Sequence, residues 1–125
     1  MVLLREGVQL YNEGQFWEAH EAWEEVWLDL RADDRDELAD LVQALILTTA
    51  AFENLDRGKP GGFATQGAKA LHRFRAQPDG LAALGVREGQ AFVDELLTVY
   101  LHVQRLGVDE LGELALDVPP LAIDV

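Results

Sequence analysis

The sequence contains no cysteine. This absence excludes disulfides, thiolate zinc sites, iron–sulfur clusters and cysteine nucleophiles together. Any metal site would therefore have to use the carboxylates and the three histidines. The sequence also lacks Gly-x-Gly-x-x-Gly, P-loop and Gly-x-Ser-x-Gly motifs, which removes the commonest nucleotide-binding and serine-hydrolase interpretations.

Basic residues are scarce. Ten lysines and arginines stand against 23 aspartates and glutamates, and the formal net charge is −13. Because binding to phosphates needs a basic surface, we expect neither nucleic acid nor an anionic membrane as a partner.

A signal peptide and a long apolar run are also missing. The first six residues lack the basic start and the apolar stretch of a signal peptide. The longest apolar-rich run, Leu41–Phe52, has 12 residues, whereas a helix needs roughly 20 to cross a bilayer. We therefore expect a soluble, cytoplasmic protein.

Apolar residues, in contrast, are plentiful: they make up 49% of 125 residues, which is enough for one hydrophobic core. They recur with a helical period nearly everywhere, and no segment alternates with a sustained period of two. Short loops between helices favour antiparallel neighbours. We predict an all-α protein with a single domain over residues 1–125, built as a bundle of about five antiparallel helices.

The expected helices cover residues 2–13, 15–30, 35–57, 63–76 and 87–106, with a last short helix at 109–116. The third is the most apolar and is expected to be central. Asp34 and Glu37 have the spacing of a capping pair at its start, and Gly58–Gly62 reads as the loop after it. The tail from Asp117 to Ile123 should be extended because it contains Pro119-Pro120, and its apolar residues should pack against the bundle or a partner chain.

Charge is distributed unevenly along the chain. Residues 16–40 contain ten acidic side chains and only two arginines, whereas residues 57–75 contain five basic side chains and no acidic one. Either the two segments are neighbours that attract one another, or they form two solvated faces that never meet.

The second expected helix carries the densest group of chemically active side chains. Successive residues turn about 100° around a helix axis, so one arc should be buried: Phe16, Ala19, His20, Trp23, Val26 and Trp27. Large aromatic residues at helical spacing are usually core, which applies to Trp17 as well. Glu24 lies at the edge of the arc, one turn after His20, and Glu21 lies further round. Glu18 and Glu25 should be solvated.

His20 and Glu24, with Glu21 beside them, are the candidate catalytic residues, as an acid–base pair or as ligands of a divalent metal. The fragment His-Glu-x-x-Glu is similar to the zinc-protease motif His-Glu-x-x-His, but the second histidine is absent. A third ligand would have to come from another helix, and the residues of suitable type are Glu53, His72 and His102. Supporting positions are Glu18, Trp27 and Gln43, the last because an amide within an apolar helix needs a partner. Tyr11 and Tyr100 are sources of further hydroxyl groups.

Three hypotheses follow from this group. The first is an enzyme that performs metal-assisted hydrolysis at His20 and Glu24. The second is a non-enzymatic protein-interaction or dimerisation module, in which the aromatic face and the apolar tail contact another chain. The third is purely structural packing, with a buried His20 that hydrogen-bonds Glu24 or a neighbouring helix.

The segment Leu10–Trp27 resembles the signature of the domain-of-unknown-function 309 family of bacteria and archaea. Leu41–Ile46 and Arg57–Gly62 are similar to the second and third blocks of that family, so the family-like core covers about residues 3–76. Leu47 stands where the family often has a second glutamine. The resemblance implies a compact helical bundle with His20, Glu21, Glu24, Glu18 and Trp27 on signature positions, and it implies no established activity.

Overall fold

The computed structural model describes residues 2–105 and 120–123. Its helices are α1 (Val2–Asn12), α2 (Phe16–Ala32), α3 (Asp36–Asp56), α4 (Pro60–Ala76), α5 (Gly80–Ala83) and α6 (Gly89–Arg105), and two short strands are β1 (Val86–Arg87) and β2 (Ala122–Ile123). The predicted all-α bundle is confirmed, and the short helix α5 lies between α4 and β1, where no helix was predicted. The short helix expected at 109–116 lies outside the described residues.

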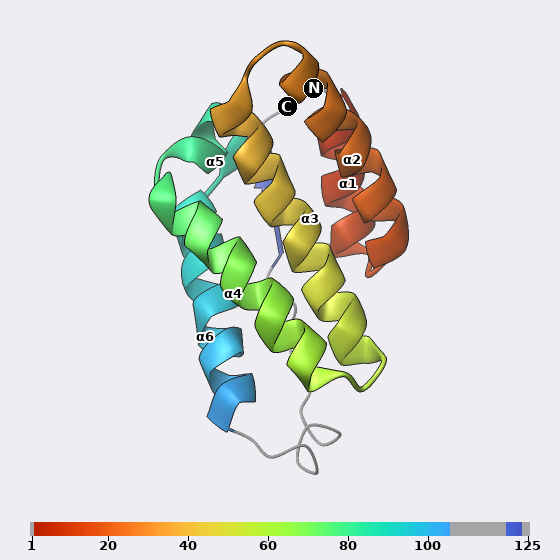
Figure 1. Cartoon of the computed structure of the whole chain (residues 1–125), viewed down its shortest axis with the longest axis vertical. Helices are drawn as coiled ribbons and strands as arrows, with labels where there is room; N and C mark the ends of the chain where they lie inside the picture. The colour runs from red at the N-terminus through yellow and green to blue at the C-terminus, as the bar shows by residue number, and fades with distance from the viewer. Residues whose placement is uncertain (1, 106–119, 124–125) are drawn as a thin grey trace.

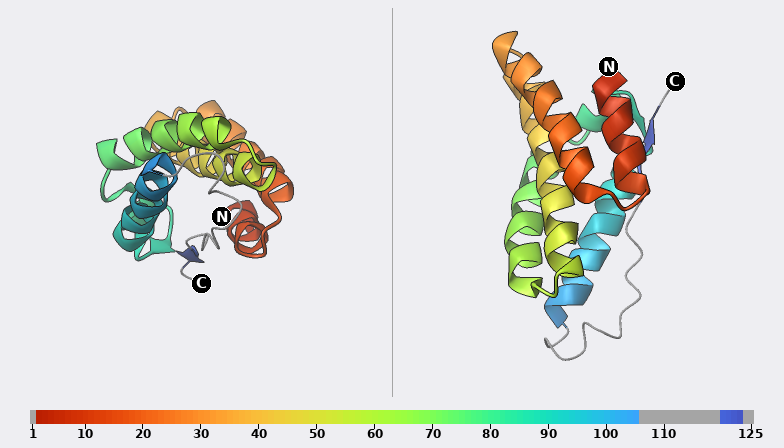
Figure 2. Two further views of the ribbon diagram at one scale, coloured as in Figure 1. Left: turned by 90° about the horizontal axis from the view of Figure 1, so that it is seen from below. Right: turned by 90° about the vertical axis from the view of Figure 1, so that its right-hand side faces the viewer.

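Helices α2, α3 and α4 form one layer, which faces the viewer in Figure 1, and α1 and α6 lie behind it (Figures 1 and 2). Helix α3 packs against both α2 and α4 and is the central helix, as predicted. Its length of 21 residues and its apolar composition would also suit a membrane span, but 56% of its most apolar stretch is buried inside the bundle. Packing against its neighbours therefore accounts for the apolar character of α3.

Aromatic side chains fill the space between the layer and α1. The Tyr11 ring lies 5.8 Å from the Phe16 ring and 6.0 Å from the Trp23 ring, measured between centroids. Trp23 is fully buried and donates a hydrogen bond from Nε1 to the Leu4 carbonyl oxygen at 3.1 Å. Burial raises the pKa of Tyr11 well above its usual value, and the negative charge of Glu95 adds to the effect. Tyr11 is therefore a neutral core residue.

Two local predictions at helix starts are wrong. Asp34 does not cap α3: it adopts a positive φ of 57° in the turn after α2, and Arg35 occupies the N-cap position without a side-chain hydrogen bond. Helix α4 begins at Pro60 and not at Phe63, because a proline in the first turn loses no helical hydrogen bond and its fixed φ suits a helix. The loop before α4 is correspondingly shorter.

The described part of the tail packs against the bundle. Strand β2 pairs antiparallel with β1, with Val86 opposite Ile123 and Arg87 opposite Ala122. The Asn12 side chain donates to the Leu121 carbonyl oxygen at 2.7 Å and accepts from the Leu121 amide at 2.9 Å. Leu121 is buried. The sequence analysis expected the tail to pack either on the bundle or on a partner chain. For residues 120–123, packing on the bundle is confirmed.

Candidate functional site

Helix α2 is continuous over the candidate site, and its buried side is the predicted one. Its buried residues are Phe16, Ala19, Trp23, Val26 and Leu30. His20 and Trp27 lie at the edge of this row and are half-buried. The expectation that Trp17 belongs to the core is wrong, since 56% of it is exposed. Trp17 lies about 100° from Phe16, on the solvent side of the buried row.

His20 and Glu24 are neighbours, as the spacing predicted. His20 Nε2 lies 3.8 Å from Glu24 Oε2, and the two side chains are 29% and 54% exposed. This separation is an ion-pair distance and too long for a hydrogen bond. The His20 ring stacks on the Trp17 ring, with centroids 5.5 Å apart and planes at 30°. His20 Nδ1 is buried and has no hydrogen-bond partner in the described residues.

The other candidate ligands do not join this pair. Glu53 is held by Arg57 at 2.8 Å, while His72 and His102 are exposed on α4 and α6. Over residues 2–105 and 120–123, no group of three histidine, aspartate or glutamate side chains is placed to hold a metal ion. The pair offers at most two protein ligands, and its chemistry is limited to sharing a proton or one cation.

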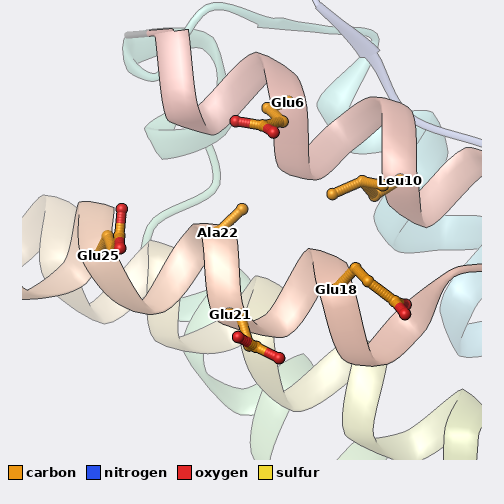
Figure 3. A pocket seen from close by; sticks show the side chains of 6 residues that line it. All are labelled: Glu6, Leu10, Glu18, Glu21, Ala22 and Glu25. Carbon is orange, nitrogen blue, oxygen red and sulfur yellow. The ribbon is translucent and has the colours of Figure 1, made fainter.

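Glu18 and Glu21 belong to a different feature, a cleft of about 370 Å³ between α1 and α2. Six residues line it: Glu6, Leu10, Glu18, Glu21, Ala22 and Glu25. Figure 3 shows that Ala22 points toward α1 while Glu21 points away from it, so the carboxylates do not converge on one point. Glu18 and Glu25 are exposed, as predicted.

The first part of the acidic segment and the basic segment lie on opposite sides of α3, and residues 36–40 of the acidic segment are part of α3 itself. Helix α2 belongs to the acidic segment and α4 to the basic one, and α3 runs between them (Figure 1). Ion pairs of the described residues include His20–Glu24, Arg31–Asp36 and Arg57–Glu53, and none of these three joins α2 to α4. Of the two interpretations of the charge pattern, separate faces apply to α2 and α4, whereas residues 36–40 of the acidic segment belong to α3, the helix that packs against α4.

The solvent side of α2 carries a stripe that the sequence analysis missed. Trp17, Glu21, Glu24 and Leu28 follow one another at intervals of four, three and four residues, which places them in one row. All four are exposed, and Leu28 is 54% exposed. The spacing was readable from the sequence, but the tryptophan was assigned to the core and the leucine received no role.

Helix α3 contributes a second row beside this stripe. Gln43, Leu47 and Ala50 are half-buried and recur at helical spacing on a helix that is otherwise largely buried. On α4, Lys69 and Arg73 follow Gly62 at intervals of seven and four residues, which places all three in one row, and a Cβ atom at Gly62 would meet the Asn54 side chain of α3. These two basic residues are therefore on the α3 side of α4.

We call the outward surface of this layer the outer face. It comprises Trp17, Glu21, Glu24 and Leu28 on α2, Gln43, Leu47 and Ala50 on α3, and Lys69 and Arg73 on α4. One edge is acidic with two large apolar side chains, the middle is weakly polar, and the other edge is basic.

Comparison with known proteins gives one family and one relative. The family described as "Domain of unknown function (DUF309)" matches residues 4–66. An uncharacterized protein of Aquifex aeolicus (strain VF5) is 30% identical over 95 residues, which are 76% of this chain. The chain spans only 28% of the length of that relative. No solved structure matches the chain.

Proposed function

The chain belongs to the DUF309 family, and from that premise we propose that it is a non-enzymatic dimerisation module whose outer face binds the outer face of a second copy. The observation that carries this proposal is the opposite charge of the two edges of one surface. Glu21 and Glu24 lie on the α2 edge, and Lys69 and Arg73 lie on the α4 edge. The α3 row, with Leu47 at its centre, separates the two edges.

Consider a two-fold axis that lies in the plane of contact, runs parallel to α3 and passes over Leu47. It would bring the α2 edge of each copy onto the α4 edge of the other. Such a contact is self-complementary and closes after two chains, so it produces a dimer and not a filament. The same charge pattern would repel a rotated arrangement that placed α2 on α2. Lys69 has no carboxylate partner within the described chain, and Arg73 donates only to the Lys69 carbonyl oxygen, at 3.3 Å. Both cations are thus available to a second copy.

Apolar side chains supply the part of the contact that charge does not. Three large apolar residues of the described chain are exposed: Trp17, Leu28 and Leu101. Two of them, Trp17 and Leu28, lie at the two ends of the α2 stripe. Tryptophan is one of the three residue types, with tyrosine and arginine, that are enriched among those that dominate the binding energy of protein interfaces. Trp17 is therefore expected to be the main apolar anchor.

Replacing Trp17 with alanine tests the proposal by sedimentation equilibrium. We expect the wild-type protein to reach a mass close to twice the 13.9 kDa of one chain. Trp17→Ala should raise the dissociation constant of the dimer at least about thirtyfold, because truncating such an anchor typically costs about 2 kcal/mol or more. Leu101→Ala is the matched control: Leu101 is 47% exposed but lies on α6, away from the outer face.

The proposal fails if the wild type remains a monomer up to millimolar concentration. It also fails if Leu101→Ala weakens association as much as Trp17→Ala does, because the contact would then not be specific to the outer face.

A second candidate function is metal-assisted hydrolysis, with a divalent cation bound by His20 and Glu24. Without a metal, the same pair, with Glu21 nearby, would be limited to acid–base chemistry. The supporting observation is the 3.8 Å between His20 Nε2 and Glu24 Oε2. One ion could contact both atoms at the usual metal–nitrogen and metal–oxygen distances of about 2.0–2.2 Å. Water or a second copy would have to supply the remaining ligands.

Thermal unfolding with zinc, manganese, iron or nickel tests this second candidate. An ion at about 100 times its dissociation constant adds about 2.7 kcal/mol, so the Tm of the wild type should rise by several degrees. His20→Ala should abolish the rise, and His102→Ala, which removes an exposed histidine of α6, should retain it. A Tm that none of the four ions raises would rule out the site.

A further inference from the structure

A groove runs between α4 and α6, on the side of α4 that faces away from α3. Its volume is about 380 Å³, and it is lined by Ala68, Leu71, His72, Arg75, Leu97 and Tyr100. The lining is mainly apolar, and the two residues that can carry positive charge, His72 and Arg75, are both exposed on α4. Pockets that bind small molecules commonly have volumes of about 300–1,000 Å³ and combine an apolar lining with a few polar groups.

The wall contributed by Tyr100 depends on the close approach of α6 to α4. A Cβ atom at position 67 would lie 3.3 Å from Cδ2 of Tyr100, so the ring lies directly against Gly67. The centroid of the ring is also 6.5 Å from that of Phe63, which lies one turn before Gly67 on α4. Two contacts thus hold the ring, and the wall of the groove does not depend on a ligand for its position.

Arg75 is a cation with no carboxylate partner among residues 2–105 and 120–123. None of the ion pairs of the described residues includes it, and residues 57–75 contain no acidic side chain although the whole chain has a net charge of −13. Guanidinium groups bind carboxylates through two parallel hydrogen bonds. An anion that enters the groove would therefore meet a free fork of donors beside an apolar surface.

We propose that this groove binds a small amphipathic carboxylate. The apolar body of the ligand lies on Leu71, Leu97 and Tyr100, and its carboxylate pairs with the guanidinium of Arg75. His72, one turn before Arg75, lies beside the carboxylate at the edge of the groove. The site is separate from the outer face, because Lys69 and Arg73 lie in the row of α4 that includes Gly62 and adjoins Asn54 of α3.

Isothermal titration with octanoate tests the proposal on the full chain. The wild type should bind octanoate with one site per chain and should bind the neutral analogue octanamide at least about tenfold more weakly, since loss of a charge-assisted pair removes 1.4 kcal/mol or more. Arg75→Gln should weaken octanoate binding by the same factor and leave octanamide binding unchanged. Lys69→Gln is the matched control, because it removes one exposed cation from the same helix outside the groove.

Leu97→Ala tests the apolar wall separately from the charge. It should weaken the binding of octanoate and of octanamide equally, because it removes part of that wall. Equal binding of octanoate by wild type and Arg75→Gln would overturn the proposal. So would an equal loss in Lys69→Gln, which would indicate general attraction of anions to α4, or no binding of octanoate by the wild type at millimolar concentration.

Discussion

Replacing Gly7 with alanine is expected to lower the free energy of unfolding by about 3 kcal/mol, although alanine is the better helix former by about 1 kcal/mol. Gly7 lies inside α1, and a Cβ atom there would overlap the indole ring of Trp23. The ring cannot easily retreat, because it is fully buried and its Nε1 donates to the Leu4 carbonyl oxygen at 3.1 Å. Overpacking costs about 1–3 kcal/mol, and a strained or lost hydrogen bond adds about 1 kcal/mol.

Thermal and urea unfolding of matched variants measure this effect. Gly61→Ala is the control, because Gly61 also lies in a helix and a Cβ atom there would meet nothing within 4 Å. It should leave stability unchanged or raise it by up to about 1 kcal/mol. The double variant Gly7→Ala/Trp23→Phe should be less destabilised than the sum of the two single changes, because a smaller ring relieves the overlap. Equal stability of Gly7→Ala and Gly61→Ala would contradict this account of the contact.

The helical bundle was predictable because its evidence is local and repeated. The row Phe16, Ala19, Trp23 and Val26 follows the helical period, and every member is buried. The central place of α3 follows from its apolar composition, which only a helix flanked on both sides can bury. Helix ends were less predictable, since the αL turn at Asp34 and the first turn at Pro60 depend on one or two residues each.

Contacts between distant segments could not be read from the sequence. The pairing of β1 with β2 involves two residues on each strand, which is too short for a period of two to be visible. The fit of Gly7 against Trp23 joins two helices whose facing sides no spacing rule specifies.

The same limit applies to the candidate site. The neighbours His20 and Glu24 were predicted from one helical turn, whereas a third ligand depended on which helices approach, and none of the three proposed residues joins them.

Reversing the charge of one edge of the outer face should abolish dimerisation, and reversing both edges should restore it. In Glu21→Lys/Glu24→Lys the α2 edge becomes basic and would face the basic α4 edge of the second copy. In Lys69→Glu/Arg73→Glu the α4 edge becomes acidic and would face an acidic α2 edge. Each variant should raise the dissociation constant about a hundredfold, because like charges placed together across an interface cost several kcal/mol. All four positions lie on exposed or half-buried sites, so the fold should be retained.

The mixture of the two variants separates this arrangement from a simple effect of net charge. The first variant is less negative than the wild type and the second is more negative, so general repulsion would weaken only the second. In the two-fold arrangement both are weakened, and an equimolar mixture forms a heterodimer in which each reversed edge meets the other's complementary edge. Sedimentation equilibrium should show the mixture associating within about tenfold of the wild type, and the four-fold variant should do the same as a homodimer. Association of the mixture no tighter than that of its components would mean that α2 and α4 do not meet in the dimer.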